Sequence, residues 1–154
     1  MTGAEALEAF RARFADAAPR APDAAPAAVV EPKDLRAQIL FLRDRLQFDF
    51  LVFVSALDRP AEGRIELVYR LFSYATKATV VLRVPVPRDG GAAPTVSDLL
   101  RTAEWHERET AEMFGVTFTD HPDPRKLLLP DDLEGHPLRK DFTHPRMIPL
   151  PVVE

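Results

Sequence analysis

Histidine and aspartate side chains recur through the last third of this 154-residue chain. Such side chains bind divalent metals and transfer protons in hydrolytic enzymes, so a metal-dependent hydrolase is one hypothesis. The candidates are His121, Asp123, Asp131, Asp132, His136 and Asp141. Their spacing matches no compact ligand pattern, and no two histidines stand one helical turn apart. We therefore expect no metal site, and metal analysis of the purified chain would decide this alternative.

Composition excludes several classes of redox and nucleotide-binding protein. The chain contains no cysteine, and cysteine thiolates are the ordinary ligands of iron–sulfur clusters and the material of disulfides. It also lacks a P-loop, a G-x-G-x-x-G motif and a G-x-S-x-G motif, so nucleotide binding and serine-nucleophile chemistry have no sequence support. We expect no catalytic residue and no bound cofactor in the chain itself.

Charge is distributed unevenly along the chain. The formal net charge is −4, and residues 101–154 hold 11 acidic against 7 basic side chains, so the acidic excess lies there. Binding of phosphate backbones needs an excess of Lys and Arg, which argues against a nucleic-acid partner. No apolar run approaches the roughly 18 to 20 residues that span a bilayer, and no signal-peptide pattern is present. We expect a cytoplasmic chain that would serve a membrane process only through a membrane-embedded partner.

The N-terminal region predicts a short helix followed by a linker. A capping box at Thr2 and Glu5, followed by apolar residues at helical intervals, predicts a helix over residues 3–15. The sequence does not decide whether this helix packs on the core or frays. Residues 17–28 are rich in Ala and Pro and have little apolar bulk, so we predict a linker that does not pack.

Periodicity from Pro32 onward predicts an α+β domain. Apolar residues at helical spacing predict a helix over residues 32–46 that faces a sheet. Strands are predicted at residues 48–57, 65–72 and 78–86, and their short connections favour antiparallel pairing. The first strand is apolar on both faces, so we place it in the centre of the sheet.

We divide the chain into three regions on these grounds. Residues 1–28 form the N-terminal helix and linker. Residues 29–118 form an α+β core, with an antiparallel or mixed sheet of three to four strands and helices on one face. Residues 119–154 form an extended, ordered docking segment.

Another helix is predicted from Ser97 to Phe114. Gly115 ends it, because glycine readily adopts the left-handed conformation that stops a helix. Glu104, Arg108 and Glu112 fall one turn apart on this helix, so Arg108 can pair with either carboxylate. Without further information these are solvent-exposed ion pairs.

The residues around and beyond this helix allow more than one interpretation. Trp105 is either a core residue or an interface anchor, and we expect it in the core. Residues 116–118 alternate like a short strand. Asp123, which precedes a proline, predicts the N-cap of a short helix over residues 125–129. Residues 131–142 lack a period, so we predict an ordered loop that is held by the surface of another chain.

Several linked motifs follow one another in this region. They read E-R-E-x-x-E-M-F-G from Glu107, D-H-P-D-P-R-K-L-L-L-P-D-D from Asp120, and E-G-H-P-L-R-K-D-F from Glu134. In these motifs the chain resembles the 30 kDa subunit family of the proton-pumping NADH-quinone oxidoreductase, respiratory complex I. The resemblance implies a partner interface made by Trp105, Glu107, Arg108, Glu109, Glu112, Phe114, Gly115, His121, Pro122, Asp123, Arg125, Leu129, Pro130, Asp131, Asp132, Gly135, His136, Pro137, Leu138, Arg139, Lys140, Asp141 and Phe142.

The resemblance also implies a role without chemistry of its own. The family's fold belongs to the peripheral arm, packed against the quinone-site (D-type) subunit and the iron–sulfur subunits. FMN, iron–sulfur clusters and quinone would then be held by partner subunits. A homologous subunit of a membrane-bound hydrogenase-type or other donor-coupled complex is the nearest alternative. Within this interface we expect Arg139 and Lys140 to meet carboxylates of a neighbouring subunit.

Overall fold

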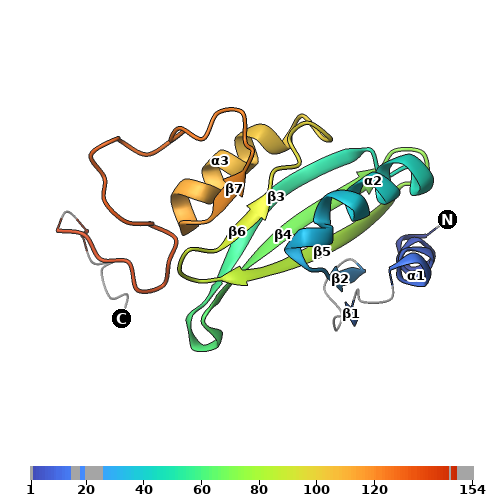
Figure 1. The fold of residues 1–154 in the computed structure, drawn as a ribbon, viewed down its shortest axis with the longest axis horizontal. Coiled ribbons are helices and arrows are strands. Elements are labelled where there is room, and N and C mark those ends of the chain that lie inside the picture. Colours follow the sequence, from blue (N-terminus) through green and yellow to red (C-terminus); the bar gives the residue numbers. More distant parts are fainter. Residues whose placement is uncertain (1, 15–17, 20–25, 146, 149–154) are drawn as a thin grey trace, which may run out of the picture.

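The computed structural model describes residues 2–14, 18–19, 26–145 and 147–148, and the elements follow one another in the order seen in Figure 1. They are α1 (Gly3–Arg13), β1 (Ala18–Pro19), β2 (Ala27–Val29), η1 (Pro32–Asp34), α2 (Leu35–Leu46), β3 (Phe50–Arg59), η2 (Pro60–Glu62), β4 (Arg64–Ser73), β5 (Ala78–Pro87), β6 (Ala92–Pro94), α3 (Ala103–Phe114) and β7 (Thr117–Thr119).

The main sheet has five strands in the order β1-β2-β5-β4-β3, and a small second sheet pairs β6 with β7. The long strands β3, β4 and β5 form an antiparallel meander, with Val54 opposite Tyr69 and Tyr69 opposite Leu82. Strand β2 joins β5 in parallel. This mixed sheet with its helices confirms the predicted α+β class.

The hydrophobic core lies between the helices and one face of the sheet. Every second residue of the long strands points into it, among them Val54, Tyr69 and Leu82, together with Leu35 and Ile39 of α2. In Figure 1, α2 crosses over the strands and α3 runs along β3, which is its main contact in the sheet. The described helices therefore lie on one face of the sheet, as predicted.

Helix α1 packs on this core. Both hydrogen bonds of the capping box between Thr2 and Glu5 are formed. Phe10 is fully buried, and its ring lies 6.5 Å from the ring of Phe41 on α2. Contacts with α2 and β5 thus hold a helix that the sequence alone left undecided.

Two predictions about the sheet are wrong. Strand β3 lies at the edge of the sheet; its second apolar face is left uncovered by the described helices. The predicted linker over residues 17–28 contains both β1 and the start of β2, and Ala28 is fully buried. Alanine packs there because the short strand lies against β5, where a small side chain fits. Residues 17 and 20–25 of that stretch lie outside the described part of the chain.

The third helix begins later than predicted. Residues 97–102 form turns, and α3 starts at Ala103. The carbonyl of Leu99 accepts a hydrogen bond from the Arg43 guanidinium at 3.0 Å, which anchors this turn to α2 in place of a regular helical bond. Gly115 ends the helix with a φ of 72°, as expected. Among the described helices, none has the length and apolar character needed to cross a bilayer.

Candidate functional site

Helix α3 holds the segment that follows it through the carboxylate of Glu112. The side-chain oxygens of Glu112 accept hydrogen bonds from the backbone N–H groups of Leu127, Leu128 and Leu129 at 2.9 to 3.2 Å. A helix over residues 125–129 was predicted, but the structure has bends there. The reason is that the backbone N–H groups at the start of the predicted helix all bond to the buried carboxylate of Glu112. Their hydrogen bonds are thereby satisfied in a conformation that is not helical.

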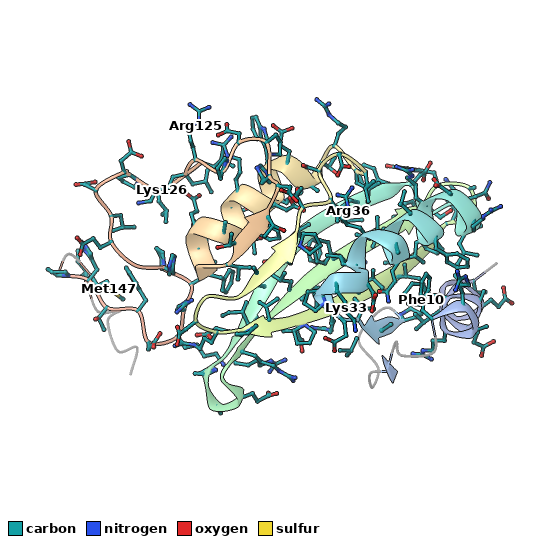
Figure 2. All side chains as sticks on the ribbon, viewed as in Figure 1. Phe10, Lys33, Arg36, Arg125, Lys126 and Met147 are labelled. Carbon is teal, nitrogen blue, oxygen red and sulfur yellow. The ribbon has the colours of Figure 1, made fainter. Side chains whose placement is uncertain are left out.

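Lys126 holds the next part of the same segment, which we call the C-terminal segment (residues 120–142). Its ammonium donates to the carbonyls of Pro130, Asp131 and Leu133 at 2.8 to 3.2 Å. In Figure 2, Lys126 lies inside the curve of this segment, whereas Arg125 projects outward from it. The ammonium of Lys126 therefore satisfies three loop carbonyls that would otherwise need partners in regular secondary structure.

Arg108 fastens the loop to α3 from the other side. Its guanidinium donates to the carbonyls of Arg125 and Lys126 at 2.9 and 3.0 Å and lies 3.3 Å from the carboxylate of Asp123. The predicted pairing of Arg108 with Glu112 on the same helix is wrong, because the carboxylate of Glu112 is occupied by loop amides. Hydrogen bonds from Arg125 and then the charge of Arg108 hold the pKa of Asp123 well below its usual range.

A second anchor joins the end of the segment to the sheet. The carboxylate of Asp58 accepts two hydrogen bonds from Arg88 and one from the backbone N–H of Lys140. Arg88 also donates to Asp141 at 2.6 Å. These bonds, that of Arg88 foremost, lower the pKa of Asp58 to about 2. The stability that this carboxylate contributes is present above pH 4 and is lost as the pH falls toward 2.

Arg139 is held by its own chain. Its guanidinium donates to the carbonyls of Phe114 and Arg88 at 2.8 and 2.6 Å and to the Asp89 carboxylate at 3.1 Å. The expectation that a neighbouring subunit supplies the partners of Arg139 is therefore wrong. It failed because carbonyls at the end of α3 lack helical partners and attract a nearby cation. The side chain of Lys140 is exposed, and its predicted contact with another subunit stays a prediction.

Both histidines of the motifs bind backbone groups. Nδ1 of His121 accepts from the Asp123 N–H at 3.1 Å, so Nε2 carries the proton and donates to the Glu104 carbonyl at 2.9 Å. Nδ1 of His136 lies 2.8 Å from the Glu112 carbonyl. No group of three metal-ligating side chains gathers within the described residues, so nothing there assembles the donor set of the hydrolase hypothesis.

Glu107 is the most deeply buried acidic residue of the motifs. It has no exposed surface, and its carboxylate accepts hydrogen bonds from the Thr95 hydroxyl at 2.5 Å and the Val96 N–H at 2.9 Å. His121 Nε2 lies 3.7 Å away but is neutral in this tautomer. Burial raises the pKa of Glu107 to about 7, although the hydrogen bonds from Thr95 and Val96 and the charge of Arg36 oppose the shift. Burial, with a smaller effect from the charge of Glu107, likewise raises the pKa of Tyr69.

This arrangement predicts a pH dependence of stability. The pKa of Glu107 is raised in the folded state above its usual 4.5, so between pH 4.5 and 7 the folded chain holds a proton that the unfolded chain releases. Stability should therefore fall as the pH rises through this window, by at most about 2 to 3 kcal/mol. In Glu107→Gln this fall should disappear. Denaturant unfolding at pH 5 and pH 8 measures it, with Glu109→Gln as the control, and identical slopes in both variants would contradict it.

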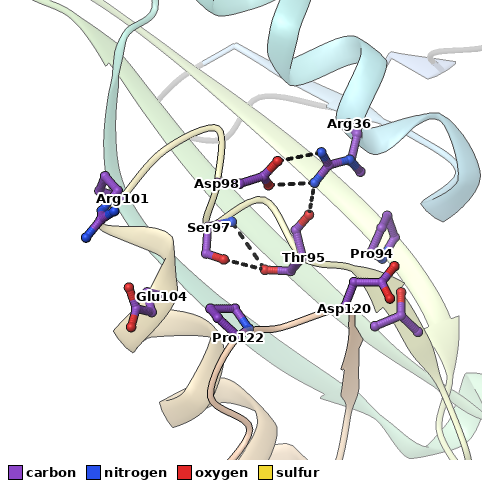
Figure 3. Close-up of a pocket in the computed structure, with 10 residues that line it drawn as sticks. Arg36, Pro94, Thr95, Ser97, Asp98, Arg101, Glu104, Asp120 and Pro122 are labelled. Atoms are coloured by element: carbon purple, nitrogen blue, oxygen red, sulfur yellow. Dashed lines mark hydrogen bonds and ion pairs between the residues drawn. The ribbon is translucent and has the colours of Figure 1, made fainter.

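A polar hollow lies beside this buried carboxylate, between α2 and the turns that precede α3. Figure 3 shows Arg36 reaching across it, with two hydrogen bonds to the Asp98 carboxylate and one to the Thr95 carbonyl. The Thr95 hydroxyl also donates to Glu107 and accepts from the Ser97 N–H. The charges at this end of the hollow thus serve to join α2 to the loop that positions Glu107.

Three large apolar residues of the predicted interface lie at the surface, whereas Phe114 is buried in the core. Trp105 is 65% exposed, so its predicted place in the core is wrong: it lies on the face of α3 opposite the buried Glu107. Leu128 and Leu138 are 61% and 53% exposed. Sequence reasoning missed Asp58 and Arg88, because they lie far along the chain from the motifs that they anchor, and no local pattern marks them.

Comparison with known proteins gives the same assignment for most of the chain. A model of the family described as the respiratory-chain NADH dehydrogenase 30 Kd subunit matches residues 28–147. The C-type subunit of the NADH-quinone oxidoreductase of Chlorobium phaeobacteroides is 44% identical over 106 residues, which are 67% of this chain and 64% of that protein. The C-type subunit of the F(420)H(2) dehydrogenase of Methanosarcina mazei is 41% identical over 103 residues, covering 66% and 65% of the two chains. The match thus spans just under two thirds of the length of each of these relatives.

A solved structure shares the fold. A chain of the membrane-bound sulfane sulfur reductase, an archaeal respiratory membrane complex, superposes with a TM-score of 0.80 at 27% identity, over 92% of this chain and 85% of that one. The family match over residues 28–147 includes the strands β3 to β5, α3 and the C-terminal segment. The chain belongs to the family of the respiratory-chain NADH dehydrogenase 30 Kd subunit.

Proposed function

We propose that the chain is a structural and assembly subunit, without redox chemistry of its own, in the peripheral arm of a proton-translocating NADH:quinone oxidoreductase. Its relatives carry the names of subunits of such oxidoreductases. The chain has no cysteine to hold an iron–sulfur cluster. Flavin, clusters and quinone belong to partner subunits in this proposal, and the quinone-site subunit and the iron–sulfur subunits are the partners.

The observation that carries the proposal is how the family motifs are used. Their charged groups, among them Glu112, Arg108 and Arg139, are directed at the backbone of the same chain. The predicted interface also presents apolar side chains outward: Trp105, Leu128 and Leu138 are each more than half exposed. A rigid irregular loop with exposed apolar side chains is suited to docking, since its shape is set before a partner binds.

Docking through this surface can be tested with Leu128→Asp combined with Leu138→Asp. When the tagged double variant is recovered from native membranes, the yield of copurifying quinone-site and iron–sulfur subunits should be at least tenfold lower than with the parent chain. The melting temperature of the isolated variant should change little, because both side chains are exposed. Arg45→Asp on α2, also exposed, is the control. Normal assembly and quinone reductase activity of the double variant would contradict the proposal.

A second candidate differs in the electron donor. The likeness to an F(420)H(2) dehydrogenase subunit and to a chain of a sulfane sulfur reductase favours a homologous subunit of another donor-coupled complex. The two candidates share the docking role and differ in their partners. Identifying the subunits that copurify decides between them: an FMN-binding subunit indicates NADH, and a nickel subunit indicates a hydrogenase-type complex.

A further inference from the structure

The main sheet carries a second face that none of the described helices covers. We call it the open sheet face. On β3 it consists of Phe50, Phe53, Ser55, Leu57 and Arg59, on β4 of Arg64, Glu66, Val68, Arg70 and Phe72, and on β5 of Val81, Arg83 and Pro85. All three helices pack on the opposite face, where the core residues lie. A sheet face that remains in water is normally polar.

The open sheet face instead carries exposed and half-buried apolar side chains along β3 and β4 beside its charges. Phe53, Leu57 and Val68 line a shallow groove along β3 and β4, and Leu57 is 40% exposed. At the end of the groove, the ring of Tyr74 packs edge-on against Phe50 and Phe72, at 5.4 and 5.0 Å between centroids. The sequence of β3 is therefore that of a strand buried on both sides, although the described part of this chain buries only one. The exposed apolar side of β3 is therefore suited to contact with another molecule.

The charge of the face identifies the kind of partner. Four arginines lie on its described part, of which Arg83 is buried, against Glu66 on the face and Glu62 beside it, which pairs with Arg64, in a chain whose net charge is −4. Arg83 pairs with Glu66 at 2.8 Å, and Arg59 lies 3.8 Å from the same carboxylate. Arg70 is exposed beside the groove. This local positive excess complements carboxylates.

The same charges argue against a second copy of the chain. Two open sheet faces related by a twofold axis would bring arginines against arginines, and like charges facing one another are destabilising. Extension of the sheet by a partner strand is also disfavoured. On the free edge, the carbonyls of Leu51 and Val54 already accept hydrogen bonds from the hydroxyls of Thr102 and Thr110. A partner helix that lies on the face neither brings arginines against arginines nor needs the edge of the sheet. It also gives the sheet a layer on each side.

We propose that the open sheet face binds an amphipathic helix of a neighbouring subunit, with an apolar stripe on the groove and acidic side chains flanking it toward the arginines. The proposal rests on the proposed function, since it assumes that the chain works inside an assembly. Ser55 lines both the groove and the crevice under Leu138. The open sheet face and the exposed side of the C-terminal segment are thus neighbouring surfaces.

Site-directed photo-crosslinking tests this assignment in the intact complex. A benzophenone amino acid replaces Leu57 in one tagged chain and Leu138 in another, each in native membranes. From Leu57 we expect a crosslink to a helix of another subunit that carries an apolar stripe and at least two acidic side chains beside it. Three results from Leu57 would overturn the proposal: a crosslink to a second copy, a crosslink to a segment without these features, or no crosslink while Leu138 still crosslinks. Each of these results would leave the proposed function standing. Failure of the unmodified chain to copurify with any membrane complex would instead overturn the proposed function.

Charge and apolar contact are tested together by Leu57→Asp with Arg70→Glu. Both side chains are exposed, so the isolated variant should keep its melting temperature within a few degrees. Its incorporation into the complex should fall at least tenfold, whereas Arg45→Glu, which makes the charge change of Arg70→Glu alone on the helix side, should assemble within about twofold of the parent chain. Equal assembly of the double variant and this control would overturn the proposal.

Discussion

Glu112→Gln is expected to release the C-terminal segment from α3. The carboxylate accepts three backbone N–H bonds, at 2.9 to 3.2 Å, and hydrogen bonds to a charged group contribute about 1.5 to 3 kcal/mol each. A glutamine side chain keeps one acceptor oxygen. Its N–H₂ group is a donor and cannot accept hydrogen bonds from the backbone N–H groups. We expect a loss of about 2 to 4 kcal/mol in the free energy that holds the segment closed.

Native-state hydrogen exchange measures this loss at the site itself. The amides of residues 127–129 should exchange at least about thirtyfold faster in Glu112→Gln, since 1.4 kcal/mol corresponds to a factor of ten. Glu109→Gln, on the same helix, is the matched control and should leave these amides unchanged. Unaltered protection in Glu112→Gln would mean that the loop is held by other contacts, and the central role of this carboxylate would have to be abandoned.

Gly115→Val is expected to destabilise the whole subunit. The residue has a φ of 72°, and a Cβ at this position would collide with the ring of His136 and with the Arg139 guanidinium. The left-handed conformation alone costs an ordinary residue roughly 1 to 2 kcal/mol. The collision adds the loss of the anchors that His136 and Arg139 make at the end of α3. We expect a total loss of at least about 3 kcal/mol, or roughly 10 °C in melting temperature.

A pair of alanine variants separates the two contributions. Gly63 has nearly the same φ, 62°, with nothing near the position of its Cβ. Gly63→Ala therefore reports the backbone strain alone, and Gly115→Ala reports strain plus collision. Thermal melting of both should show Gly115→Ala as clearly the less stable. Equal melting temperatures would show that the loop moves aside without loss, so that its packing on Gly115 contributes little.

The elements of this protein were predictable where local spacing decides them. The capping box of α1, the stripe of α2, the three long strands and the left-handed stop at Gly115 each depend on residues within a few positions of one another. Strand order was not predictable in the same way. The two apolar faces of β3 indicated burial on both sides, but pairing partners are chosen by the whole sheet, and β3 lies at its edge.

The candidate site shows the same division more sharply. Its motifs, read from the sequence, identified the family and named Glu112, Arg139 and His136 as important, because such residues in one order are rare together. What they bind was decided by tertiary structure alone. The carbonyls and amides that they satisfy lie 15 to 51 residues away along the chain. Side-chain type thus determined that these groups need partners, and only the folded chain, by bringing α3, β5 and the C-terminal segment together, determined that most of those partners are its own backbone.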